Sequence, residues 1–116
     1  MGWGDELMVT AQARELQRAD PRRVAVRGKN GSSRWHPIWD GNPRLARPDE
    51  VSAGCDVQWL HNHSGARPYI DYAHSTRWRW RWKKDWRVAA GEIYLTGAER
   101  RLGEQLKQSI VVEPNL

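Results

Sequence analysis

Apolar positions in the first part of the chain predict a helix followed by a strand. Over residues 5–16 the apolar side chains recur at roughly helical spacing: Leu7, Met8, Ala11 and Leu16. The helix should stop at Asp20-Pro21, because proline cannot continue it. Residues 22–28 then form a short run rich in β-branched side chains, which is typical of a strand. The brief link between them fits a buried parallel strand better than a hairpin.

The middle of the chain predicts one more strand and an aromatic connection. Residues 56–60 follow Gly54 and precede a polar stretch, so we expect a strand there. Leu45-Ala46 fits a two-residue bridge at a sheet edge. Residues 35–43 contain two prolines and two tryptophans, and we expect these indoles to pack over one end of the sheet.

The last third of the chain predicts a helix and a final strand. Thr96 and Glu99 match a capping box, and Ala98, Leu102 and Leu106 recur every four residues, so a helix should run to about residue 108. Residues 109–114 are typical of a buried strand that ends at a proline. The whole pattern predicts an α/β fold: one Rossmann-like domain over residues 1–116, with a small, mostly parallel sheet.

Tryptophan and arginine alternate with period two between residues 77 and 82. On a strand the indoles would share one face and the guanidinium groups the other. In one interpretation the indoles cover the core and the cations face water, which we favour. In the other, this Arg-Trp tract binds single-stranded nucleic acid or an acidic protein, as an inhibitor for example. The tract comprises Arg77, Trp78, Arg79, Trp80, Arg81, Trp82, Lys83 and Lys84.

Composition limits the class of protein. The 116 residues suffice for one modest core, and the net charge of +5 favours an anionic partner, although ordinary solubilising surface also explains it. The chain has eight tryptophans and no phenylalanine, so either the core uses indoles or several of them form a binding face. Its one cysteine excludes an internal disulfide, and no apolar run is long enough for a signal sequence or membrane span. We therefore expect a cytoplasmic protein.

The first candidate site is the N-terminal glycine turn. Gly2 and Gly4 allow a close approach of the backbone to a ligand, and Asp5 follows where the helical pattern begins. Asp5 could act as a general base toward a hydroxyl acceptor, or simply cap the helix. In either role the helix dipole favours its ionised form.

The second candidate site is the polar loop after the second strand. Open α/β sheets bind ligands at the carboxyl ends of their strands, so His61, His63 and Gly65 are candidate ligand-binding residues. With Cys55 the two histidines offer three possible metal ligands, but the spacing matches no zinc framework. We expect no metal and no cofactor.

Several motifs resemble the amino-terminal half of glycosyltransferase family 9-like proteins, relatives of ADP-heptose lipopolysaccharide heptosyltransferases. The resemblance lies in residues 4–8, 35–43, 65–71 and 110–115. It implies a GT-B architecture, in which the amino-terminal domain handles the acceptor and a second domain binds most of the nucleotide-sugar. It also implies that Asp5 is the catalytic base, and it adds Arg67 and Tyr69 to the candidate ligand-binding residues.

Relative to that family pattern, the strand before the glycine turn and the donor domain are missing. We therefore expect an incomplete acceptor-side domain, truncated or repurposed, that lacks transferase activity alone and binds a sugar or nucleotide-sugar. The sheet edge left by the missing strand should invite pairing, which predicts a homodimer.

Overall fold

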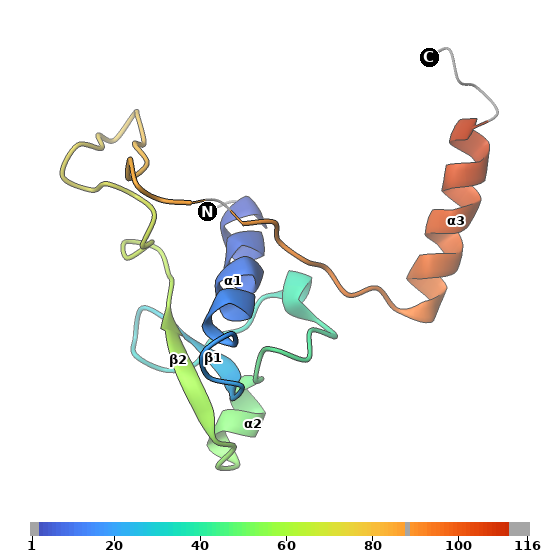
Figure 1. Cartoon of the computed structure of the whole chain (residues 1–116), viewed down its shortest axis with the longest axis horizontal. Coiled ribbons are helices and arrows are strands. Elements are labelled where there is room, and N and C mark those ends of the chain that lie inside the picture. Colours follow the sequence, from blue (N-terminus) through green and yellow to red (C-terminus); the bar gives the residue numbers. More distant parts are fainter. Residues whose placement is uncertain (1–2, 88, 112–116) are drawn as a thin grey trace.

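The computed structural model describes residues 3–87 and 89–111. Helix α1 (Trp3–Leu16) packs along a sheet of two parallel strands, β1 (Arg23–Arg27) and β2 (Val57–His61) (Figure 1). A short 3-10 helix, η1 (Pro37–Trp39), and a one-turn helix, α2 (Pro48–Ser52), lie on the connection between the strands. Helix α3 (Gly97–Val111) stands apart from this body in Figure 1. The fold is therefore mixed α/β with a small parallel sheet.

The strands predicted at residues 22–28 and 56–60 are confirmed. Arg23 pairs with Val57 and Arg27 with His61, so the strands are in register along their whole length. Leu45 forms a parallel bridge to Val24 on the other edge of β1, as expected for residues 45–46. Because β1 has neighbours on both edges, its three central residues are buried.

The core joins α1, β1, β2 and the aromatic connection. Its buried members are Val9, Ala13, Val24, Val26, Trp39, Leu45 and Leu60. The indole of Trp39 is fully buried and donates to the backbone oxygen of Glu6 at 2.7 Å, which satisfies its one polar atom. Residues 35–43 therefore bring one indole into the core, and Trp35 packs against it partly buried. The predicted stripe on α1 is displaced, since Val9 and Ala13 face the core and Leu7 and Met8 are only half-buried.

The Arg-Trp tract is not a strand. A turn in which Thr76 and Arg79 exchange backbone hydrogen bonds reverses the chain inside the tract, and the backbone after it pairs with residues 69–71. Only Trp82 forms a β-bridge among the described residues of the tract, with Ile70. The interpretation in which Trp78, Trp80 and Trp82 cover the core is wrong, because all three indoles are exposed.

The carboxyl-terminal prediction is half correct. Thr96 and Glu99 form the expected reciprocal cap of α3, with N–H···O distances of 2.8 and 3.1 Å. The helix continues to Val111, so the predicted strand is wrong over residues 109–111, and residues 112–116 lie outside the described part. β-Branched residues favour a strand only beside a sheet neighbour, and α3 stands away from the sheet (Figure 1). Among the described residues no helix is long and apolar enough to cross a membrane.

Candidate functional site

A buried ionic network fixes the start of α1 at the carboxyl ends of both strands. Arg34 follows β1 and Asn62 follows β2, and both meet near Glu6 in the first turns of α1. The guanidinium of Arg34 binds both carboxylate oxygens of Glu6 and the backbone oxygen of Asn62. Arg67 donates to Glu6 Oε1 at 2.9 Å and to Asn62 Oδ1 at 2.7 Å. The N-terminus of α1 therefore lies at the edge of the sheet where α/β folds bind ligands.

The charges of this network hold Glu6 in its ionised form. Burial by itself would raise the pKa of Glu6, but hydrogen bonds and charges from Arg34 and Arg67 outweigh it and hold the pKa below its usual value. Arg67 is 3% exposed. The guanidinium of Arg67 therefore has its hydrogen-bond partners inside the domain. It positions the loop after β2 and does not reach a ligand at the surface, contrary to the prediction that Arg67 binds a ligand.

Asp5 lies inside the first turn of α1, one residue before Glu6. Its Oδ1 accepts a hydrogen bond from the Tyr69 hydroxyl at 2.6 Å. The Tyr69 side chain is fully buried, and burial, followed by the neighbouring Asp5 carboxylate, raises the pKa of its phenol. Tyr69 therefore stays a neutral hydrogen-bond donor at neutral pH, and it fixes the orientation of the Asp5 carboxylate.

Aromatic rings from the Arg-Trp tract complete a pocket over Asp5. The Tyr69 ring stacks on Trp82 with centroids 4.9 Å apart and meets Trp86 at 5.4 Å. Trp80 packs edge-on against Tyr72 at 6.2 Å. The pocket has a volume of about 200 Å³ and is lined by Asp5, Tyr69, Ile70, Trp80 and Trp82. It combines one carboxylate with exposed indole faces.

A second, open depression of about 910 Å³ shares two of these walls. Trp80 and Trp82 line it together with Asp71, His74, Arg79, Arg81 and Lys84. His74 is paired with Asp71 at 2.6 Å, and the hydrogen bond from His74 lowers the pKa of that carboxyl. None of the five cations of the tract has an ion pair within the described part of the chain. The tract is therefore a basic and aromatic surface.

The other predicted ligand residues lie outside the Asp5 pocket. Gly4 is part of α1 rather than of a turn before it, and Gly2 lies outside the described residues. Gly65, with a positive φ of 86°, sits in a tight turn closed by the Ala66 amide donating to the His63 oxygen at 2.8 Å. His61 is exposed at the end of β2, and it is absent from the described walls of the pocket. In the described residues no cluster of His, Cys, Asp or Glu could hold a metal ion.

Sequence reasoning missed two features of this region. It identified Asp5 and the Arg-Trp tract separately, and nothing in their spacing indicates that Trp80 and Trp82 meet Asp5. It also gave no role to Glu6, Arg34 or Asn62, because their meeting depends on how the strands and α1 are arranged. Comparison of the chain with protein-family models, curated proteins and solved structures found no match.

Proposed function

We propose that this chain is the acceptor-side domain of a glycosyltransferase, Rossmann-like in origin, truncated or repurposed. The observation that carries the proposal is the pocket in which the Asp5 carboxylate meets the indoles of Trp80 and Trp82. The position of Asp5 at the carboxyl edge of the parallel sheet and the motifs in the sequence that resemble family 9 glycosyltransferases support it.

The pocket chemistry suits one sugar ring. The apolar C–H face of a pyranose packs on an indole, while its hydroxyl groups need fixed hydrogen-bond acceptors. A carboxylate can accept several hydrogen bonds, so Asp5 keeps acceptor capacity after binding the Tyr69 hydroxyl. In transfer, Asp5 would take the proton of the attacking acceptor hydroxyl. The oxygen of that hydroxyl would form a bond to the donor sugar carbon, and the nucleotide would leave with the electrons of the bond that breaks.

The size of the pocket argues against transfer by this chain alone. Sites that enclose drug-sized ligands have volumes of about 300–1,000 Å³. The Asp5 pocket, at about 200 Å³, holds one ring but not a nucleotide-sugar as well. A nucleotide-sugar donor would therefore have to bind to a separate surface.

Calorimetric titration with saccharides and with nucleotide-sugars tests this function. We expect saccharide binding that Asp5→Asn weakens at least tenfold, because a charged acceptor is replaced by a neutral amide. We expect no product when the isolated chain is incubated with ADP-heptose and an acceptor. Saccharide affinity equal in wild type and Asp5→Asn would refute the assigned site, and turnover by the isolated chain would refute the claim of inactivity.

A second candidate function is binding of nucleic acid or an acidic protein by the Arg-Trp tract. Trp78 is 86% exposed and does not line the Asp5 pocket, and its ring carries the Arg77 guanidinium at 5.0 Å. Exposed indoles beside cations without ion pairs suit stacked bases and phosphates, or carboxylates of a protein.

Two single substitutions separate these functions. Affinity for single-stranded DNA should fall steeply with salt and should drop in Trp78→Ala, while Asp5→Asn leaves it unchanged. Saccharide affinity, in contrast, should drop in Asp5→Asn and stay unchanged in Trp78→Ala. DNA affinity that does not depend on salt, or no DNA binding at all, removes the nucleic-acid version of the second function.

A further inference from the structure

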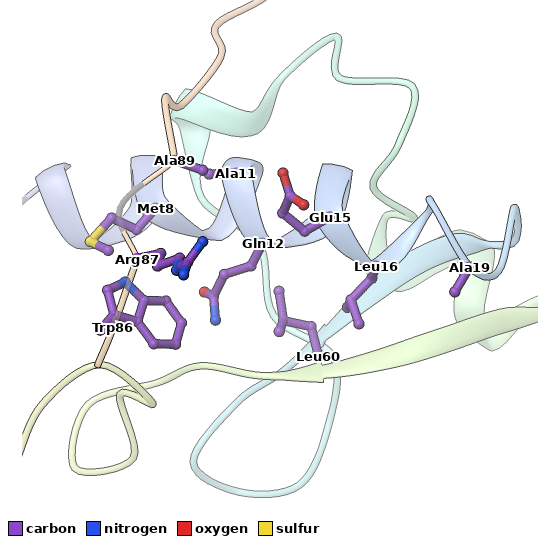
Figure 2. A pocket seen from close by; sticks show the side chains of 10 residues that line it. All are labelled: Met8, Ala11, Gln12, Glu15, Leu16, Ala19, Leu60, Trp86, Arg87 and Ala89. Carbon is purple, nitrogen blue, oxygen red and sulfur yellow. The ribbon is translucent and has the colours of Figure 1, made fainter. Parts of the chain in front are cut away.

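Three faces of α1 have different surroundings, and one of them is an open apolar groove. Glu6, Val9 and Ala13 face the core and the ionic network. A second face, which includes Thr10 and Arg14, is crossed by the segment 90–94. The third face lines a groove of about 380 Å³ shown in Figure 2, with Leu60 and Trp86 opposite the helix. The full lining is Met8, Ala11, Gln12, Glu15, Leu16, Ala19, Leu60, Trp86, Arg87 and Ala89.

Helix α3 is the counterpart of this groove. It is amphipathic, and Leu102 and Leu106, one turn apart, are 56% and 55% exposed. It stands apart from the body (Figure 1). Isolated helices shorter than about 12–15 residues are marginal in water, and most helical stability in proteins comes from packing of an amphipathic face. Helix α3, with its 15 residues, is close to that limit, so it needs a surface to cover its leucines.

The segment 90–94 prevents α3 from reaching the groove of its own chain. Arg14 donates to the Ala90 oxygen at 2.6 Å, and the Glu92 amide donates to Thr10 Oγ1 at 2.9 Å. Glu92 also pairs with Arg44 at 2.8 Å. After Tyr94, which lies against Gly41, only Leu95 and Thr96 precede α3. Three residue steps span about 10 Å, too little to carry α3 around a helix about 10–12 Å across.

We propose that α3 of a second copy of this chain docks in the groove on α1, and that two copies exchange α3 reciprocally. Leu102 and Leu106 would enter the groove one turn apart, as in other helix-in-groove interfaces. Glu99, which shares the face of α3 that carries Leu102 and Leu106, is opposite in charge to Arg87 at the groove. The arrangement is a closed twofold dimer in which each copy covers the other's leucines and groove. It shares no residue with the Asp5 pocket and is independent of the proposed function.

Light scattering after size exclusion, over a range of protein concentrations, tests this dimer. We expect a mass of twice 13.5 kDa for the wild type. Leu102→Asp/Leu106→Asp on the helix and Ala11→Glu in the groove should each raise the dimer dissociation constant at least about tenfold. Arg100→Asp, which places an acid on the opposite face of α3, should leave it unchanged. Circular dichroism and tryptophan fluorescence of each variant verify that the body is folded.

Mixing the two disrupted variants gives the sharper test. The groove variant keeps an intact α3 and the helix variant an intact groove, so the mixture should form a heterodimer that neither variant forms alone. A monomeric wild type at high concentration overturns the proposal. So does a dimer that survives Ala11→Glu, which would indicate pairing of β2 edges or of α3 with α3. Failure of the mixture to associate overturns it as well.

Discussion

The hydroxyl of Tyr69 donates to Oδ1 of Asp5 at 2.6 Å, joining residues 64 positions apart. This bond ties the first turn of α1 to the chain after β2. Because Tyr69 also stacks on Trp82, the same residue orients the carboxylate and places an indole beside it. Asp5 and the Arg-Trp tract therefore meet through Tyr69.

Removing the Tyr69 hydroxyl should weaken this link and leave the ring in place. Tyr69→Phe keeps the stack on Trp82, so we expect the free energy of unfolding in urea to fall by about 1.5–3 kcal/mol, the contribution of a hydrogen bond to a charged group. In a double-mutant cycle with Asp5→Asn, the two losses should not add, with a coupling above about 0.5 kcal/mol. Simple additivity would show that the bond contributes nothing to stability.

Glu6→Gln should destabilise the fold strongly. The substitution leaves the guanidinium groups of Arg34 and Arg67 without their shared counter-charge. Breaking a buried ion pair costs about 3 kcal/mol or more, out of a total of about 5–15 kcal/mol for a domain. Urea denaturation measures the loss.

Glu15→Gln is the matched control for that substitution. Glu15 is exposed, and within the part of the chain that the structure describes its ion pair is with Arg18 on the helix surface, at 3.2 Å. Surface pairs contribute about 0–1 kcal/mol, so this variant should resemble the wild type. If Glu6→Gln and Glu15→Gln lowered the free energy of unfolding equally, the role assigned to Glu6 would be contradicted.

Stability should fall on acidification, and Glu6 should account for part of that fall. The pKa of Glu6 is lower in the folded protein than its usual 4.5, so the unfolded chain takes up the proton first as pH drops. Its contribution is complete above pH 4.5 and is lost as pH falls through the folded value. Hydrogen bonds from the Arg23 side chain and the Arg47 backbone lower the pKa of Glu50 to about 2 and add to the same trend.

Urea unfolding at a series of pH values measures this dependence. Glu6→Gln cannot titrate at position 6, so its free energy of unfolding should depend less steeply on pH below 4.5 than that of the wild type. Parallel curves for the two proteins would contradict the assignment.

Gly91→Ala should detach the segment 90–94 from α1. A Cβ at this position would lie 2.8 Å from Leu7 Cδ1 and 2.9 Å from the Leu7 backbone oxygen. The backbone must shift to relieve this overlap, at a cost of about 1–3 kcal/mol. Thermal unfolding and proteolysis of the segment measure the effect.

Gly4→Ala is the matched control for Gly91→Ala. A Cβ at Gly4 meets nothing within 4 Å, and alanine favours a helix. Its stability should equal or slightly exceed that of the wild type. If Gly4→Ala is folded but does not bind saccharide, the prediction that a ligand approaches the backbone closely at Gly4 would be supported after all.

Local signals in the sequence were sufficient for the strands and for the start of α3. The β-branched run at residues 24–26 and the reciprocal cap of Thr96 and Glu99 depend on near neighbours, and both are confirmed. The strand at residues 109–111 failed because strand propensity needs an adjacent strand, which helix α3 lacks. The prediction from alternation in the Arg-Trp tract failed because the turn between Thr76 and Arg79 reverses the chain inside the tract.

The candidate site depended on tertiary arrangement. The sequence indicated Asp5 through its place at the start of a helical pattern. It could not indicate Tyr69 and Trp82 as neighbours of Asp5, because that contact requires the loop after β2 to fold over the helix. The burial of Arg67 also depends on its ion pair with Glu6. Such a pair between distant residues produces no periodic pattern in the sequence.

The indole N–H signals in a ¹⁵N-¹H spectrum test the central claim most directly. The eight tryptophans give eight such signals, and saccharide titration should shift those of Trp80 and Trp82 while leaving Trp59 and Trp78 in place. Asp5→Asn should abolish these shifts without changing the spectrum of the free protein elsewhere. Shifts at Trp78 or Trp59 instead, or shifts at Trp80 and Trp82 that persist in Asp5→Asn, would contradict a sugar site built on Asp5.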